Sequence, residues 1–269
     1  IGDSVGEVQA LNNLGSALFG LWDYPEALAI HEQGVERSRE IGYRLGESDH
    51  LDNVGGAAWA VGDYDTAIAR YREALEIRTE MEDAWGMAVS TNNLAGAYAA
   101  VGDWDRALQL YERALDIDRQ IGRRRGQAYD WHGIGVTKLE QGDLDGAAEA
   151  LTEAAEIRFD LGESHLCNES RVALALALAR QGRRAEAVEV VDEALESEGS
   201  HPFSAAAEAT ASFLRAIEVL EPSDPERAAE LRSLGRRTML ERAARISDER
   251  YRRMYLEDVA AHREMAGAP

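Results

Sequence analysis

A period of 40 residues runs through residues 1 to 199 and limits what this chain can fold into. Its clearest copies are Trp22-Asp23-Tyr24, Gly62-Asp63-Tyr64, Gly102-Asp103-Trp104, Gly142-Asp143-Leu144 and Gly182-Arg183-Arg184. A fixed period of this length indicates supersecondary units that stack on one another, because a single unit cannot bury its apolar face alone.

Three columns of the repeat hold only small residues. They are Gly15, Gly55, Ala95, Gly135 and Ala175; Ala27, Ala67, Ala107, Ala147 and Ala187; and Gly34, Ala74, Ala114, Ala154 and Ala194. We expect two helices to cross closely there, because a larger side chain would overpack the crossing.

Apolar residues such as Leu108, Tyr111 and Leu115 recur at helical spacing within a unit. Each unit therefore reads as two helices. The Gly-Asp pair between them suits a left-handed helix end followed by an N-cap.

These columns resemble the tetratricopeptide repeat (TPR) family, in the 40-residue subclass found in kinesin light chains and in bacterial transcriptional regulators and signalling ATPases. The resemblance implies an all-α fold, a right-handed α-α superhelix or TPR solenoid, whose first helices line a concave groove. It implies binding rather than catalysis.

The period predicts five TPR units within residues 1–199. Their approximate bounds are 8–40, 48–80, 88–120, 128–160 and 168–197. Residues 200–269 depart from the pattern and are expected to form a degenerate sixth helix pair and a C-terminal capping helix. The pair is expected at 203–220 and 226–246, and Ser247 or Asp248 is expected to cap the last helix.

A further column, expected in the turns between units, contains Gly6, Gly46, Gly86 and Gly126. Ile1-Gly2 matches the Ile41-Gly42 turn, so we expect the chain to be the C-terminal segment of a longer protein. Residues 246–264 also resemble the terminal segment of TPR regions in large bacterial ATPase-linked and cyclase-linked regulators. The missing N-terminal part would then be an effector domain.

The charge balance excludes several kinds of partner. With 50 acidic against 29 basic side chains, the net charge is -21, which disfavours direct contact with nucleic acid or anionic lipid. The single cysteine, Cys167, cannot form an internal disulfide, which favours a cytoplasmic location. The charged fraction of 29% argues against a membrane span.

We find no pattern of residues that would support catalysis. Lys138 lacks the glycines of a phosphate-binding loop, and the six histidines show no paired metal spacing. His31 falls at a packing position, and the run 123–125 of arginines reads as a solvated loop. We therefore expect no enzymatic activity, no cofactor and no metal.

The TPR resemblance places candidate ligand contacts on the inner face of the first helices. They are Gln9, Asn12, Asn13, Phe19, Asp49, Asp52, Asn53, Trp59, Asn92, Asn93, Tyr129 and His132. Asn13, Asn53 and Asn93 occupy one column, and a carboxamide matches the N–H and C=O groups of an extended peptide. The same asparagines could instead bond a neighbouring repeat. Phe19 and Trp59 share another column, where they would offer an apolar contact unless a helix covers Trp59.

The resulting hypothesis is a protein- or peptide-binding TPR module, which serves as the sensor or partner-docking domain of a larger bacterial signalling or regulatory protein. The acidic surface favours a neutral to basic polypeptide held in the groove. The alternative is an intramolecular regulatory clamp, or an oligomerisation scaffold, for an absent effector domain such as an ATPase, transcription factor or peptidase.

Overall fold

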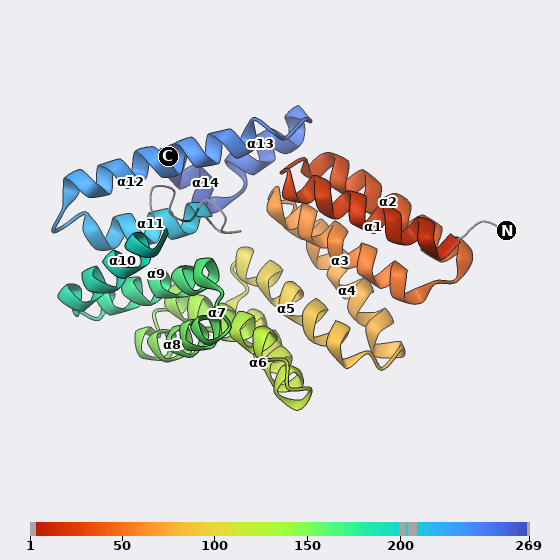
Figure 1. Cartoon of the computed structure of the whole chain (residues 1–269), viewed down its shortest axis with the longest axis horizontal. Coiled ribbons are helices and arrows are strands. Elements are labelled where there is room, and N and C mark those ends of the chain that lie inside the picture. The colour runs from red at the N-terminus through yellow and green to blue at the C-terminus, as the bar shows by residue number, and fades with distance from the viewer. Residues whose placement is uncertain (1–3, 199–202, 204–208, 268–269) are drawn as a thin grey trace. The chain divides into compact units, whose positions relative to one another are not determined.

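The computed structural model describes residues 4–198, 203 and 209–267, and every regular element in those ranges is a helix (Figure 1). The expectation of an all-α fold is confirmed. The chain divides into a first unit, Ile1–Ile117 with Glu241–Ala260, and a second unit, Asp118–Leu240 with Ala261–Pro269. We describe each unit separately.

The first unit contains two complete helix pairs, a third pair's first helix and one C-terminal helix. They are α1 (Ser4–Gly20), α2 (Tyr24–Ile41), α3 (Arg44–Ala60), α4 (Tyr64–Glu80), α5 (Ala84–Ala100) and α13 (Glu249–Glu257). Helix α6 (Trp104–Gln120) begins in this unit and ends in the second. Each helix of α1–α5 packs on the next in the chain, and α3 also contacts α1 and α5. The first helices of successive repeats are therefore neighbours.

The second unit continues the same pairing. It contains α7 (Arg124–Gln141), α8 (Leu144–Asp160), α9 (Ser164–Arg180), α10 (Arg184–Glu198) and α11 (Ala209–Leu220), most of α12 (Pro225–Ala243) and most of α14 (Ala260–Ala266). Of the helix predicted over 203–220, residues 209–220 are helical, and 204–208 lie outside the described residues. Phe203 is not helical, contrary to the prediction; it occupies a turn with φ of 60°.

The turns within the pairs form as the Gly-Asp motif predicts. Gly62 has φ of 88° and Asp63 accepts a hydrogen bond from the Thr66 backbone N–H at 3.2 Å. Asp248 caps α13 by accepting bonds from the N–H groups of Arg250 and Tyr251 at 2.8 and 3.1 Å. These bonds confirm the predicted Gly-Asp turn and the predicted cap at Asp248.

The small-residue columns lie where large side chains of the partner helix cross them. A Cβ on Gly15 would stand 2.5 Å from His31 Nε2. The equivalent Cβ on Gly55 would stand 2.6 Å from Tyr71 Cε1, and that on Gly135 would stand 2.5 Å from Leu151 Cγ. The helices of these three pairs are thus held together by a large side chain seated on a glycine.

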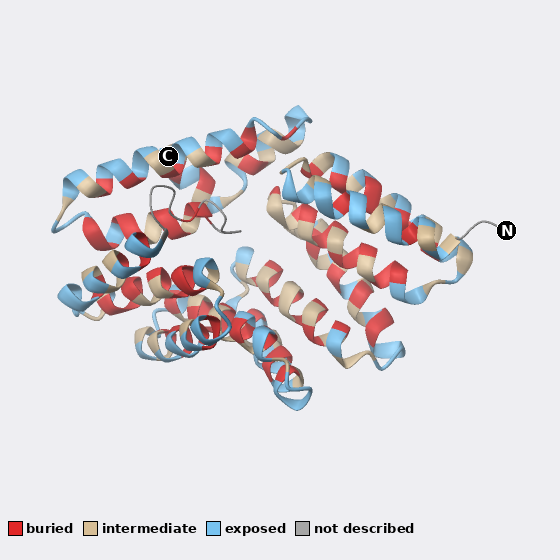
Figure 2. Ribbon diagram, viewed as in Figure 1, coloured by how far each residue is buried: buried red, intermediate tan, exposed pale blue. Residues whose placement is uncertain are grey.

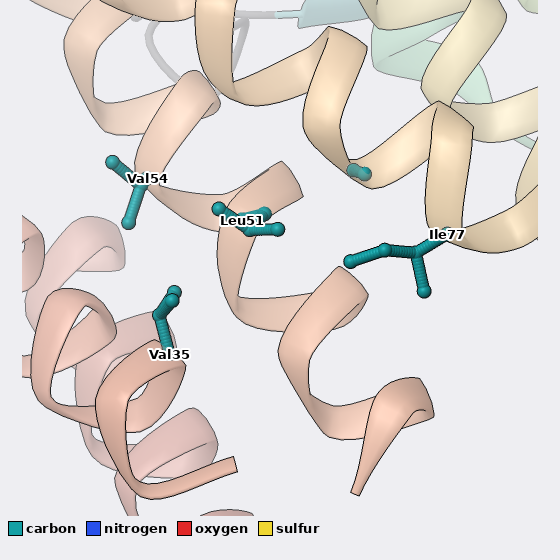
Figure 3. Packing of buried hydrophobic residues seen from close by; sticks show 5 residues of the cluster. Val35, Leu51, Val54 and Ile77 are labelled. Atoms are coloured by element: carbon teal, nitrogen blue, oxygen red, sulfur yellow. The ribbon is translucent and has the colours of Figure 1, made fainter. Parts of the chain in front are cut away.

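The apolar core runs between successive pairs. In the first unit, Val35, Leu51, Val54 and Ile77 form a buried cluster between α2, α3 and α4 (Figure 3). Leu14 occupies the column of Val54 but remains 48% exposed on α1. Figure 2 shows buried residues (red) alternating with exposed residues (pale blue) along the helices.

The first helix of each described repeat begins four residues before the expected start of its unit, at Ser4, Arg44, Ala84, Arg124 and Ser164. Consequently Gly86 and Gly126 lie inside the first helical turn and not between units. A Cβ on Gly86 would overlap Asp83 and Arg78, and one on Gly126 would overlap Asp118. These glycines make room for buried charged side chains.

The sign of the charge at this repeat position changes along the array. Arg78 at the end of α4 is bound by Asp83 at 2.7 Å, whereas Asp118 at the end of α6 is bound by Arg123 at 2.6 Å. Arg78 and Asp118 are both buried. These two successive junctions between repeats therefore each contain an acid and a base, in opposite orders.

The first repeat replaces this arrangement with a pair of buried histidines. His31 Nδ1 lies 3.0 Å from His50 Nδ1, and His50 Nε2 lies 3.2 Å from the Val8 carbonyl oxygen. Because a carbonyl only accepts, His50 donates through Nε2 and its Nδ1 accepts from His31. Burial and the neighbouring His50 lower the pKa of His31 to about 4. The predicted packing role of His31 is confirmed.

His50 also explains the one glycine in the third small column. A Cβ on Gly34 would overlap the His50 imidazole, while the later repeats hold alanine at this position. We expect Gly34→Ala to lower the free energy of unfolding by about 1–3 kcal/mol through overpacking. In a His50→Ser background, which copies Ser90 of the next repeat, the same change should be neutral or stabilising. Urea denaturation of the four proteins in this cycle measures the difference, and equal costs in both backgrounds would contradict the assignment.

The histidine pair should make stability depend on pH. An unfolded histidine binds a proton below pH about 6.5, whereas folded His31 resists protonation down to about 4, so stability falls as pH falls through that window. We expect a loss of about 2 kcal/mol between pH 7 and pH 5. The matched variant is His31→Tyr with His50→Ser, the combination found at Tyr71 and Ser90. A double variant that loses as much stability as wild type over this range would refute the effect.

Candidate functional site

The amides predicted to bind a ligand lie on three neighbouring helices of the first unit. We call this set the amide face: Gln9, Asn12 and Asn13 on α1, Asn53 on α3, and Asn92 and Asn93 on α5. Asn13 is exposed, and Asn53 and Asn93 are half-buried. Helix α3 contacts both α1 and α5, so the helices that carry these amides are neighbours.

One bond joins two of these amides across the repeats. Asn53 Nδ2 donates to Asn12 Oδ1 at 2.8 Å. Asn53 therefore stabilises the stacking of α3 on α1, as the structural alternative predicted. This bond leaves the Oδ1 atom and one amide hydrogen of Asn53 unused. It also leaves both amide hydrogens of Asn12 unused. A role in the array and a role in binding are thus compatible.

The two predicted aromatic contacts have different environments. Phe19 is 39% exposed and meets Tyr24 edge-on, with ring centroids 5.2 Å apart. Trp59 is half-buried, and its Nε1 is buried without a hydrogen-bond partner among the described residues. An indole N–H is a donor that ordinarily finds an acceptor when it is buried.

The acidic candidates contribute to contacts within a repeat and between repeats. Asp49 binds the buried Arg78, and Asp52 accepts a hydrogen bond from Ser90 Oγ at 2.8 Å. Burial raises the pKa of Asp52 to about 7, although the Ser90 bond and Arg78 oppose the shift. Asp52 therefore supports the packing of α3 on α5 and is not a freely exposed anion.

Tyr129 and His132 belong to the second unit and form a cluster with a buried arginine. Arg158 donates to Ser170 Oγ at 2.7 Å and its guanidinium lies 5.3 Å from the Tyr129 ring centroid. His132 Nδ1 lies 3.1 Å from the same Ser170 oxygen. Burial, with Arg158 and Arg215 nearby, lowers the pKa of His132 well below its ordinary value. This imidazole is consequently a neutral hydrogen-bonding group.

Sequence reasoning missed the importance of these buried arginines. Arg78 and Arg158 are both buried and stand 80 residues apart in the same column. Ser90 and Ser170 keep the same spacing. The sequence did contain a signal for these buried arginines, namely a charged residue at a repeat position that apolar residues surround. The arginines of the 123–125 run are likewise paired, with Asp118, Asp160 and Glu163 respectively.

The single cysteine lies in an environment that disfavours thiol chemistry. Cys167 is buried, its Sγ lies 3.5 Å from the Ala155 carbonyl oxygen, and burial raises its pKa, which disfavours the thiolate. Among the described residues, no group of His, Cys, Asp and Glu is arranged to hold a metal ion. Within those same ranges, every helix is too short or too polar to cross a bilayer.

The fold is shared with several solved structures. Aspartyl phosphate phosphatase F from Bacillus subtilis matches 88% of this chain with a TM-score of 0.71 and 13% identity, and the match covers 61% of the phosphatase. A Rap protein in complex with the competence and sporulation factor matches 97% of the chain, with a TM-score of 0.68, 16% identity and 76% of its own length covered.

A signal transduction ATPase with numerous domains and a tetratricopeptide repeat sensor, from Pyrococcus horikoshii, matches 90% of the chain with a TM-score of 0.65 and 13% identity. Only 37% of that protein is covered. At these identities the likeness establishes the fold. No protein of curated function matches the chain in sequence.

Family models give the final assignment. One tetratricopeptide repeat model matches residues 7–80 and 86–158, and a second matches residues 133–205. These matches cover more than half of the chain and coincide with the helix pairs in which a large side chain is seated on a glycine. The chain belongs to the tetratricopeptide repeat family.

Proposed function

We propose that this chain is a polypeptide-binding module and that the amide face, with Phe19 and Trp59, holds an extended segment of its ligand. The observation that carries the proposal is the alignment of asparagines on α1, α3 and α5, which are neighbouring first helices. Membership of the TPR family supports binding as the function, and the related Rap fold is seen in a complex with the competence and sporulation factor.

The hydrogen-bonding capacity of the amide face suits a peptide backbone. An extended peptide presents alternating N–H and C=O groups, and each carboxamide offers both a donor and an acceptor. The bond between Asn53 and Asn12 fixes two of the amides in place before any ligand arrives. Such preorganisation reduces the entropy lost on binding.

The surrounding groups define the ligand further. Phe19 supplies exposed apolar surface on α1, and Trp59 at the same repeat position of α3 is half-buried. The net charge of -21 disfavours an acidic ligand. We therefore infer a neutral to basic segment with at least one apolar side chain.

In the cell, we infer that the module is the sensor or docking part of a larger signalling or regulatory protein. The Pyrococcus ATPase combines a TPR sensor with other domains, and this chain spans 37% of it. Two kinds of ligand fit this description: a separate polypeptide, or an effector domain of the same protein. A ligand tested in trans decides whether the surface is free to bind.

The test uses two amides that are not involved in the array. Within the described residues, Asn13 and Asn93 make no side-chain hydrogen bond, so Asn13→Ala with Asn93→Ala removes ligand contacts and spares the bond between Asn53 and Asn12. Each hydrogen bond to a ligand is worth about 0.5–1.5 kcal/mol, so the double variant should bind about five- to one-hundred-fold more weakly. A peptide selected on the wild-type protein from a displayed random library serves as the probe, and fluorescence anisotropy gives its Kd.

The matched control is Gln33→Ala, which removes an exposed amide from α2, outside the amide face. It should leave the Kd unchanged, and circular dichroism should show equal helical content in all three proteins. If the double variant binds as tightly as wild type, the amide face is not the binding surface.

A further inference from the structure

The C-terminal part of the chain contacts the first repeat. We call residues 241–260 the clasp segment; it belongs to the first unit together with residues 1–117. Ser247 Oγ donates to Asp23 Oδ1 at 2.9 Å, which joins positions 224 residues apart in sequence. The contact lies at the turn between α1 and α2. A terminal helix that only covered the last repeat would not make it.

Trp22 in this turn breaks the rule that the other repeats follow. Its column is otherwise glycine, at 62, 102, 142 and 182, and all five residues have positive φ. Trp22 has φ of 63°, a conformation that is unfavourable for a bulky residue. The indole receives two guanidinium groups from the clasp segment, Arg242 at 5.0 Å and Arg245 at 5.6 Å from the ring. These cation–π contacts compensate for the backbone cost.

The neighbouring residues complete the interface. Tyr24 stacks on Tyr255 with ring centroids 6.3 Å apart and an interplanar angle of 29°, and both rings are buried. Burial raises the pKa of Tyr255 to about 12, so this phenol stays neutral. A Cβ added to Gly62 in the next turn would lie 3.0 Å from Asp258 Cβ, so the segment reaches the second repeat as well.

Asp23 does not cap the helix that follows it, unlike the aspartates at the same position of other repeats. Asp63, Asp103 and Asp143 each accept a hydrogen bond from a backbone N–H of the helix that follows. Asp23 makes no such cap bond, and its carboxylate accepts from Ser247 instead. Three consecutive residues, 22 to 24, are thus committed to the clasp segment at a local cost to the first repeat.

The interface is connected to the amide-bearing side of α1 through one aromatic ring. Phe19, a candidate ligand contact, meets Tyr24 edge-on at 5.2 Å, and Tyr24 in turn stacks on Tyr255. A ligand that moves Phe19 therefore acts on the ring that holds the clasp segment.

We propose that residues 241–260 form a reversible clasp on the first repeat, held by Trp22 and Tyr24, and that its opening is coupled to ligand contact at Phe19. The coupling rests on the binding function proposed above, whereas the clasp does not. Residues 247–250 are exposed and α13 has only nine residues, so this segment is expected to open before the helix pairs unfold. A ligand that prefers one position of Phe19 shifts the fraction of open clasp.

Hydrogen exchange of α13, followed by mass spectrometry on the whole chain without ligand, tests the clasp. Trp22→Gly removes the indole but supplies the residue that the turn conformation favours, so α1 and α2 should keep their protection. We expect amides of α13 to exchange at least tenfold faster. The matched control is Glu82→Gly, which makes the same backbone change in the turn between α4 and α5, where the residue also has positive φ (55°). It should leave α13 unchanged.

A second variant tests the coupling. Phe19→Ala should speed exchange in α13 about threefold or more, while Phe159→Ala, which removes a 69% exposed ring from α8, should not. Unchanged exchange in Trp22→Gly overturns the clasp and leaves the amide face standing. An effect of Trp22→Gly without one of Phe19→Ala retains the clasp and overturns its coupling to ligand contact.

Discussion

The seating of a large side chain on a glycine or alanine of the partner helix is the contact on which every repeat depends. His31 on Gly15, Tyr71 on Gly55 and Leu151 on Gly135 are chemically different, yet each fills the same space at the same crossing. Where the small residue is glycine, its helix has a weaker intrinsic helix propensity, and the lack of a side chain permits the close approach. Once that distance is set, the second helix of one pair meets the first helix of the next, and the core of Val35, Leu51 and Val54 follows.

The repeat could be predicted from sequence because its constraints are local and recur every 40 residues. Helix pairing, the Gly-Asp turns and the cap at Asp248 all follow from residues within a few positions of one another. The first-turn glycines were harder to interpret. Gly86 and Gly126 looked like turn residues, but they accommodate side chains eight positions earlier in sequence, Arg78 and Asp118. Whether a buried column holds an acid or a base depends on packing across three helices, which no period reveals.

The candidate site was predictable to a different degree. The asparagine column was evident, and so were its two possible roles; the bond between Asn53 and Asn12 accounts for one of them. The environment of Asp52 was not evident, since its burial depends on Arg78 and Ser90 from two other helices. The contact between the clasp segment and the first repeat joins residues more than 200 positions apart. Its only trace in the sequence is a tryptophan where the other repeats have glycine.

The opposite order of acid and base at successive junctions affects how an array of similar helix pairs assembles in the right order. Apolar and small columns are nearly the same in every repeat, so by themselves they would allow a helix pair to stack on the wrong neighbour. Arg78 fits beside Asp83, but a skipped repeat would bring this buried guanidinium against the half-buried Arg123 in place of the Asp83 carboxylate. Asp118 facing Glu163 would be equally unfavourable. The junction charges thus distinguish one helix pair from the next and oppose misassembly and exchange between chains.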